Sequence, residues 1–286
     1  MNRSTLRIAL CLLGALAVAA CGSQNDAIGG VDLDGNEVQR GGIFDTVISG
    51  TEGEAGWVFM FAEGETVRNR DRIVGYARDQ SAQLTGRFVG AASSGNTRRA
   101  SVLWFDKILV TPEPDPDADP DDPPLEPMLE TRVRTAVLEI DIDPAKSFSG
   151  QVVGDGLNVN LSATYNRRHY ERVSGVSLLS GIWENLDPFG GELLRLDFNS
   201  QGGFGGRDID DCNYAGQVYE INRRYNLYAF ELASACDEAV DATGLATIEP
   251  PPVNPGASPR QRLIAVVPAR TNDAVYMIDV SRAVTP

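Results

Sequence analysis

The chain has 286 residues, of which 42% are hydrophobic and 23% are charged, and its formal net charge is −15. The apolar fraction is too high for wholesale disorder, and no apolar run reaches the roughly 20 residues that a membrane-crossing helix needs, which excludes a polytopic helical membrane protein. A chain this acidic would repel a phosphate backbone, so nucleic-acid binding is not expected.

Residues 1–20 have the pattern of a bacterial signal peptide. Arg3 and Arg7 supply the positive start, and residues 8–20 form an apolar stretch that is too short to span a bilayer. The stretch ends in Val-Ala-Ala directly before Cys21. This arrangement resembles the lipobox of bacterial lipoproteins. An ordinary secretory signal with a chance cysteine is the alternative interpretation.

The lipobox resemblance implies that Cys21 is lipidated and becomes the mature N-terminus. Several acyl chains would then anchor the protein stably in a lipid bilayer. Gly22 follows the cysteine, where lipoproteins kept at the inner membrane typically have Asp, so the resemblance implies the outer membrane, on a face that the sequence does not specify. Residues 21–40 are polar and contain glycine, which predicts a flexible tether. Cleavage removes Arg3 and Arg7 and no acidic residue, which gives the mature chain a formal charge of −17.

Residues 41–172 are predicted to form the first of two β domains. Short runs of alternating or β-branched residues favour about eight strands in this part of the chain. These runs are residues 42–49, 57–62, 72–77, 82–91, 100–110, 133–142, 148–153 and 157–165.

Residues 111–127 form a Pro/Asp-rich segment between two of these strands, with seven acidic residues and no basic one. Proline stiffens the backbone into an extended form, which favours a solvated hairpin tip. The alternating carboxylates leave weak calcium binding as the alternative, although the central glycine of an EF-type loop is missing. A shorter calcium-like pattern at residues 32–37 is better explained by turn chemistry.

His169 is the only histidine of the chain. Any histidine-dependent catalytic or zinc site would therefore need it, and sites with several histidines are excluded. It lies in the polar run 166–170 at a strand end, which favours a surface or interdomain position over a catalytic base. The chain has no Gly-x-Ser-x-Gly elbow, phosphate loop or His-Glu-x-x-His motif. We therefore predict no catalytic residue, no cofactor and no metal site.

Residues 173–286 are predicted to form the second β domain, which begins with a short helical connector at residues 173–180. About eight more strands are expected at residues 181–186, 192–199, 203–208, 213–221, 227–235, 245–248, 262–268 and 274–280. The prediction is all-β, with two meander-type, eight-stranded barrel-like domains, and sandwiches are the alternative. Residues 202–206 are glycine-rich but precede a strand, so they favour a tight turn over a phosphate site.

The openings of the two sets of strands are similar. Residues 41–44 read Gly-Gly-Ile-Phe, and residues 180–183 read Ser-Gly-Ile-Trp. Together with the similar strand number, this suggests a duplicated unit.

Cys212 and Cys236 are the candidates for a disulfide bridge, because Cys11 leaves with the signal peptide. Residues 212–219 and 227–236 read as the two strands of an antiparallel hairpin. Centring its turn on Arg224 pairs Val218 with Phe230, Gly216 with Leu232 and Cys212 with Cys236. Directly opposed residues have Cα atoms roughly 4.5 to 5.5 Å apart, which suits a structural bridge.

The opening Gly181-x-Trp183 of the second set is similar to that of the calycins, a family of barrels that includes the lipocalins. In that family a basic residue of the last strand packs over the Trp, and the resemblance gives this role to Arg282, beside a small-ligand interior. Residues 41–286 as a whole resemble a group of two-domain all-β bacterial lipoproteins, through the two Gly-x-Phe/Trp openings, the phrase Cys212-x-Tyr-x-Gly, Asn226-x-Tyr, Cys236 and Thr243-Gly-Leu-Ala. This second resemblance implies fold and location, and no activity.

Three functional hypotheses remain open. The first is a non-enzymatic envelope lipoprotein that binds a protein or cell-surface partner through its β domains. The second is a calycin-like carrier of a small hydrophobic molecule, and the third is a carboxylate-dependent hydrolase. Aromatic residues alternate at Trp57, Phe59 and Phe61, but such stripes indicate a packed core more often than a ligand wall.

Overall fold

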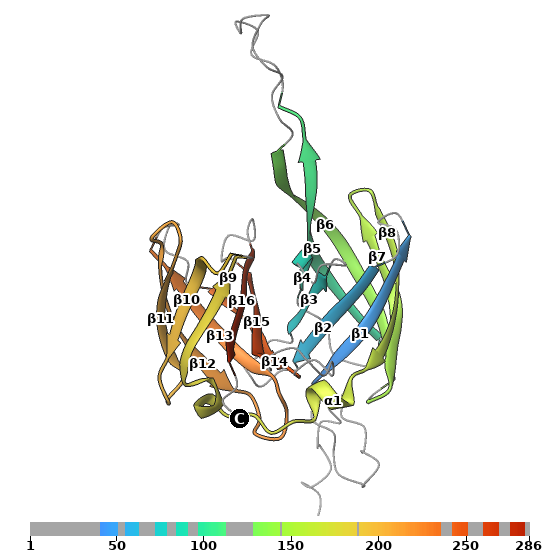
Figure 1. Ribbon diagram of the computed structural model, residues 1–286. Helices are drawn as coiled ribbons and strands as arrows, with labels where there is room; N and C mark the ends of the chain where they lie inside the picture. The colour runs from blue at the N-terminus through green and yellow to red at the C-terminus, as the bar shows by residue number, and fades with distance from the viewer. Residues whose placement is uncertain are drawn as a thin grey trace, which may run out of the picture.

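A computed structural model shows two all-β barrels that stand side by side (Figure 1). It describes residues 41–50, 55–62, 72–78, 84–90, 97–112, 128–143, 145–187, 189–235, 242–250, 260–268 and 275–283. Several predicted features lie outside these residues: the signal peptide, Cys21, the tether with residues 32–37, most of the acidic segment and Cys236.

The first barrel is an antiparallel meander in which each strand pairs with the next and β8 returns to β1. Seven residue pairs close it, from Phe44 opposite Tyr165 to Gly50 opposite Val159. Its strands are β1 (Gly41–Gly50), β2 (Ala55–Ala62), β3 (Arg72–Arg78), β4 (Leu84–Gly90), β5 (Thr97–Val110), β6 (Met128–Asp143), β7 (Ser147–Gly154) and β8 (Leu157–Tyr165).

The second barrel repeats this order, but its closure is weaker. β16 meets β9 at the one register pair Ser281 and Glu184. Its strands are β9 (Gly181–Leu186), β10 (Glu192–Phe198), β11 (Gly203–Asp208), β12 (Asn213–Glu220), β13 (Tyr228–Ser234), β14 (Ala242–Glu249), β15 (Arg260–Pro268) and β16 (Val275–Ala283). The barrel prediction is confirmed for both halves, and the sandwich alternative is wrong.

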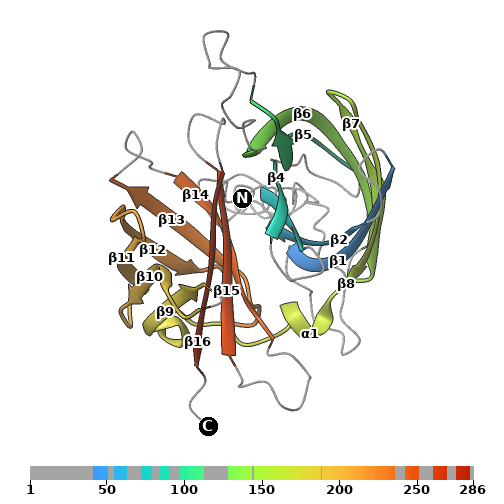
Figure 2. The same cartoon turned by 45° about the horizontal axis from the view of Figure 1, so that its top comes forward.

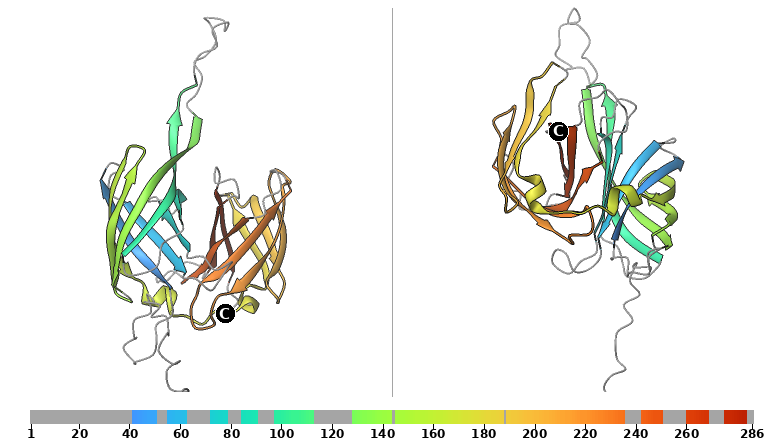
Figure 3. Two further views of the ribbon diagram at one scale, coloured as in Figure 1. Left: turned by 180° about the vertical axis from the view of Figure 1, so that it is seen from behind. Right: turned by 60° about the horizontal axis from the view of Figure 1, so that its bottom comes forward.

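Two short helical turns connect the barrels at one end of the molecule (Figure 3). The 3-10 helix η1 (Val176–Leu179) lies within the predicted helical connector. The single turn α1 (Arg167–Tyr170) was not predicted. Asn166 caps it, because its Oδ1 accepts a hydrogen bond from the His169 backbone N–H at 2.8 Å.

Alternate residues of the strands fill both barrels, as the period of two requires. In the first barrel, Trp57 lies 4.8 Å from Trp104 between ring centroids, and Phe59 lies 5.6 Å from Phe148. The aromatic stripe at Trp57, Phe59 and Phe61 is therefore core, as predicted. The two matching openings place Phe44 and Trp183 inside their respective barrels.

The barrels contact each other through outward-facing apolar residues of β14 and β15 on one side and β3 and β4 on the other. Figure 2 shows β14 and β15 on the side of the second barrel that faces β4. This interdomain cluster includes Met60, Val74, Tyr76 and Phe105 of the first barrel and Leu245, Ile264, Val266 and Val275 of the second. Hydrogen bonds border it: Arg72 donates to the carbonyl of Thr243 at 2.5 Å, and the Tyr76 hydroxyl donates to Glu249 at 3.0 Å.

Strands β5 and β6 are much longer than their neighbours. Residues Lys107–Val110 pair with Met128–Thr131, beyond the last β4 partner at Asp106 and the first β7 partner at Val137. We call this two-stranded extension the ribbon. It projects from the end of the first barrel opposite the connector (Figure 1).

Candidate functional site

Trp183 and Arg282 close one end of the second barrel together. The Arg282 guanidinium lies 4.5 Å from the centre of the Trp183 ring, an arrangement that favours cation–π attraction. Its Nη1 donates to the Ser180 carbonyl at 2.6 Å and its Nη2 to the Leu178 carbonyl at 2.5 Å. Trp183 Nε1 donates to the Leu179 carbonyl at 2.6 Å. The contact predicted for Arg282 is therefore present, and it fixes η1 against the barrel.

The interior beside Trp183 is occupied by side chains. The Trp183 ring contacts Phe198, Phe198 contacts Phe204, and Phe204 contacts Phe230, with centroid separations of 6.5, 4.9 and 4.9 Å. All four residues belong to one buried cluster. In the described part of this barrel, Trp183 therefore helps to fill the interior, and Arg282 closes the end.

His169 belongs to a buried polar cluster in the connector. Its Nε2 lies 3.0 Å from Oγ1 of Thr247 on β14. Asn226 ties the same region together: its amide nitrogen donates to the carbonyls of His169 and Ile248 at 3.0 and 2.6 Å, and its amide oxygen accepts from the Ile248 N–H at 3.2 Å. The predicted surface or interdomain histidine is therefore interdomain and buried.

The pair of His169 and Thr247 is not arranged as a base and a nucleophile. The Thr247 hydroxyl has one proton, and it donates that proton to the Asn226 carbonyl at 2.8 Å. His169 Nε2 must then be the donor to Thr247, so it cannot take the hydroxyl proton. Thr247 is fully buried, so a substrate could not reach it. The cluster holds the connector in place.

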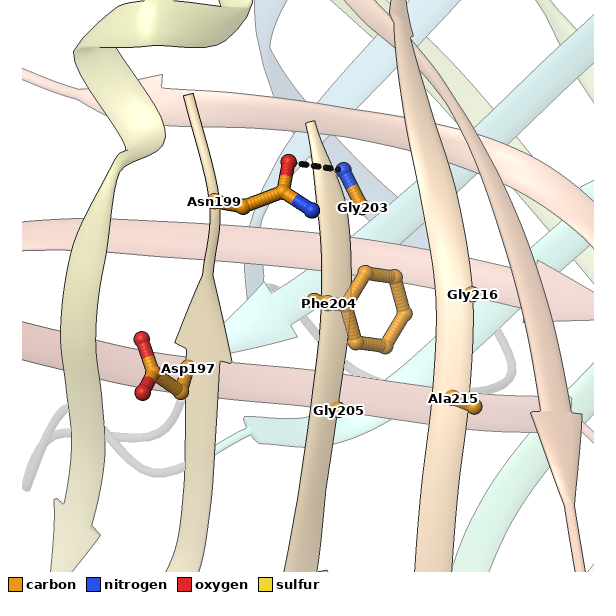
Figure 4. A pocket seen from close by; sticks show the side chains of 7 residues that line it. All are labelled: Asp197, Asn199, Gly203, Phe204, Gly205, Ala215 and Gly216. Carbon is orange, nitrogen blue, oxygen red and sulfur yellow. Dashed lines mark hydrogen bonds between the residues drawn. The ribbon is translucent and has the colours of Figure 1, made fainter. Parts of the chain in front are cut away.

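An open hollow of about 580 Å³ lies over the glycine-rich strand β11 (Figure 4). Asp197, Asn199, Gly203, Phe204, Gly205, Ala215 and Gly216 line it. Asn199 Oδ1 accepts the N–H of Gly203 at 3.0 Å in the turn before β11, and Gly202 there has a φ of +86°. The tight turn predicted for residues 202–206 is therefore present only at Gly202, because residues 203–206 lie in β11. The carboxylate of Asp197 would repel a phosphate.

A smaller hollow of about 350 Å³ lies at the weak seam between β9 and β16. Both oxygens of the Asp279 carboxylate accept hydrogen bonds from Arg262, one of them at 2.5 Å. Arg262 therefore engages both oxygens of this carboxylate in an ion pair. The seam therefore does not support the hydrolase hypothesis.

The hairpin expected around the cysteines has the predicted register. Val218 lies opposite Phe230 and Gly216 opposite Leu232, and the last pair of the ladder is Tyr214 with Ser234. The Ala235 N–H donates to the Asn213 carbonyl at 3.0 Å, which continues the ladder toward Cys212. Cys236 lies outside the described residues, so its pairing with Cys212 stays a prediction.

The end of the molecule that carries the ribbon also exposes large apolar side chains. Phe189, in the turn between β9 and β10, is 98% exposed, and Ile209, in the turn between β11 and β12, is 66% exposed. The Ile209 N–H donates to the carbonyl of Leu193, near the start of β10, at 3.0 Å, so the two turns lie at the same end of the barrel. Sequence reasoning missed this surface, because an exposed apolar residue in a turn has no periodic pattern.

Comparisons of the chain with models of known protein families, with curated proteins and with solved structures gave no match. Among the described residues, no cluster of three or more His, Cys, Asp or Glu side chains is suited to a metal ion. Within that same part of the chain, no helix has the length and apolar character to cross a membrane.

Proposed function

We propose that this protein is a non-enzymatic lipoprotein of the bacterial outer membrane that binds a protein partner with the end of the molecule that carries the ribbon. Acyl chains on Cys21 would hold it to the bilayer. The two barrels would act as a rigid support for the ribbon and for the exposed turns of the second barrel.

The ribbon is the observation that carries the proposal. Among the described strands, Lys107–Val110 and Met128–Thr131 pair only with each other, so no described strand pairs with either edge of the ribbon. An isolated two-stranded hairpin is at best marginally stable in water, and open edges are usually short, charged or covered. A two-stranded ribbon that no described strand covers is therefore easiest to explain when a partner covers it.

Two further features support a partner at this end. Phe189 and Ile209 are exposed in neighbouring turns of the second barrel, and large exposed apolar side chains are typical of protein contacts. The acidic segment 113–127 lies in sequence between the two strands of the ribbon, and a basic partner surface would be attracted to it. The carrier hypothesis has no comparable support, because the aromatic cluster beside Trp183 occupies the described interior.

Photo-crosslinking in intact envelopes tests the proposal. A benzophenone amino acid is placed at Glu130, which is exposed in the ribbon, at Phe189, and at Asn160, which is exposed on the outer face of β8 as the control. We expect the same larger adduct from positions 130 and 189 and none from position 160. Adducts that are equal at all three positions, or absent at 130 and 189, would contradict the proposal.

A shortened hairpin provides the second arm. Asp106 and Arg132 are directly paired, so an Asn-Gly turn in place of residues 107–131 closes the hairpin at that pair without straining the barrel. This variant should lose the adduct at Phe189 while it keeps its folded circular-dichroism spectrum. In the matched control, residues 113–127 are replaced by a Gly/Ser segment of equal length, which keeps the ribbon and should keep the adduct.

A further inference from the structure

We propose that the connector end of the molecule docks on the surface of an anionic lipid bilayer, an inference that rests on the proposed lipid anchor. β1 begins at this end, because the Ile43 carbonyl accepts the N–H of Asn166, the cap of α1, at 2.8 Å. Gly41 follows Cys21 by 20 residues, and a flexible chain of that length has an end-to-end distance of about 25 Å. The ribbon projects from the opposite end (Figure 1). The anchor would therefore bring the connector end closer to the bilayer than the ribbon.

Arginine is concentrated at the connector end of a chain that is acidic as a whole. Residues 167–182 and 220–226 contain five arginines and two glutamates, a formal charge of +3, whereas the whole chain has −15. The turn at residues 222–226 packs on the connector, since the Ser174 N–H donates to the Arg223 carbonyl at 2.9 Å and the Asn226 N–H donates to the Tyr170 carbonyl at 2.8 Å. The two segments therefore form one continuous surface.

The ion pairs of this surface expose their positive members. Arg167 pairs with Glu171 at 2.6 Å, and their side chains are 45% and 24% exposed. Arg223 pairs with Glu220 at 2.9 Å, and their side chains are 87% and 21% exposed. In both pairs the carboxylate lies deeper than the guanidinium, so a surface that approaches from outside meets the arginine first.

Two further arginines add charge that no carboxylate offsets. Arg168 and Arg224 are exposed, and neither has an ion-pair partner among the described residues. Arg172 is directed inward, where its Nη1 donates to the Ile248 carbonyl at 3.3 Å. Asp45 of β1 borders the surface and accepts a hydrogen bond from the Asn166 amide at 2.7 Å. Four arginines are therefore available to an external anion.

Exposed apolar side chains lie among these arginines. Val173 is 78% exposed and directly precedes Ser174, which is bonded to Arg223, and Leu178 of η1 is 44% exposed. We call the set of exposed residues at this end the connector face: Arg167, Arg168, Val173, Leu178, Arg223 and Arg224. It lies along α1, η1 and the segment between them (Figure 3). Apolar side chains beside basic ones are typical of surfaces that rest in the headgroup region of a bilayer.

Phosphate headgroups of the bilayer are the occupant that this chemistry fits. The planar guanidinium fork of arginine matches a phosphate better than a compact ammonium does. Attraction to a charged surface fades within a Debye length of about 10 Å, so a flat bilayer below the connector face is screened from the acidic residues farther up the barrels. A long polyanion that wraps around the molecule would meet those acidic residues as well.

Vesicle sedimentation tests the inference on the full mature chain with Cys21→Ser, which has no acyl chains. We expect binding to vesicles of phosphatidylethanolamine with about 30% phosphatidylglycerol at about 0.1 M salt, and binding at least about tenfold weaker to pure phosphatidylcholine or at about 0.5 M salt. Equal binding to both kinds of vesicle, or no binding to either, would overturn the inference.

Charge-reversal variants locate the contact. One basic residue near an anionic surface changes binding about fivefold, so Arg224→Glu should weaken binding to the anionic vesicles at least about tenfold. Arg207→Glu is the matched control, because Arg207 on β11 is 65% exposed and lies 3.6 Å from Asp211, away from the connector face. Equal weakening by the two variants would show that only net charge matters, and would overturn the assigned face.

Tryptophan fluorescence measures which end contacts the lipid. The three natural tryptophans are buried, so a tryptophan placed at an exposed position reports on that position. Brominated acyl chains in the anionic vesicles should quench Val173→Trp and not Val153→Trp, whose site is 45% exposed at the end of β7 far from the connector. Quenching of Val153→Trp alone would reverse the orientation and overturn the inference.

The docking face and the proposed function can fail separately. If the crosslinks at Glu130 and Phe189 form but the chain does not bind anionic vesicles, docking fails and the partner at the ribbon stands. If vesicles bind through the connector face but those crosslinks are absent, the partner fails and docking stands. A protein adduct from benzophenone at Arg224, in a chain that does not bind vesicles, would show that an acidic protein occupies the connector face, and would overturn the choice of a bilayer.

Discussion

At the closed end of the second barrel, Arg282 holds the carbonyl groups of Leu178 and Ser180 while its guanidinium lies over Trp183. Each hydrogen bond from a charged donor is worth about 1.5 to 3 kcal/mol when buried, and partial exposure of Arg282 reduces this. We expect Arg282→Ala to lower the free energy of unfolding by about 1 to 3 kcal/mol, measured by urea denaturation. Arg282→Lys should restore only part of the loss, because a compact ammonium cannot reproduce the planar fork of the guanidinium.

Arg223 provides the control for this prediction. Its side chain is 87% exposed and pairs with Glu220 at 2.9 Å, and exposed pairs of this kind contribute about 0 to 1 kcal/mol. Arg223→Ala should therefore change stability much less than Arg282→Ala. Equal effects of the two substitutions would show that Arg282 does not hold the end of the barrel.

Residues with a pattern in the sequence were predictable, and residues with long-range partners were not. Gly181-x-Trp183 and Arg282 could be assigned because a resemblance supplied the pair. The partners of His169 lie 57 and 78 residues away at Asn226 and Thr247. No local spacing connects them, because the connector has to fold across the second barrel before they meet.

At the scale of elements, the β12–β13 hairpin allows a test of the predicted bridge. Closing a loop of about 25 residues is worth roughly 3 kcal/mol in the chain-entropy model. The double substitution of Cys212 and Cys236 by serine should therefore lower the free energy of unfolding by about this amount, and reductant should destabilise the natural chain but not the variant. Two free thiols in non-reducing peptide mapping, with equal unfolding midpoints, would contradict the bridge.

The sixteen strands among the described residues were predictable in approximate number and in order, because short runs of alternating or β-branched residues mark them. The extra length of β6 was missed. The prediction began this strand at residue 133, whereas β6 begins at Met128. Among the described strands, residues 128–132 pair only with β5, and alternation that follows from burial fades where a strand leaves the barrel. The ribbon therefore lies where sequence periodicity carries least information.

At the scale of the whole molecule, the interdomain cluster should make the two barrels unfold together. Val74 on β3 is buried in this cluster, whereas Val47 on β1 is an outward-facing valine of the same barrel that is 49% exposed. An aspartate at position 74 would place an unpaired carboxylate between the barrels, which costs several kcal/mol, and an aspartate at position 47 would remain in water. The two substitutions make the same chemical change on the same kind of surface and differ only in whether the second barrel covers it.

We expect the natural chain and Val47→Asp to show one cooperative transition in thermal unfolding. Val74→Asp should separate the transition into two steps, and hydrogen exchange should accelerate first at Tyr76 and Ile264, on the two sides of the cluster. If the natural chain already unfolds in two steps, or if Val74→Asp unfolds in one step at the natural temperature, the interdomain cluster does not couple the barrels. The ribbon and the turns at Phe189 and Ile209 would then lack a common support, and a partner could not contact both at a fixed separation.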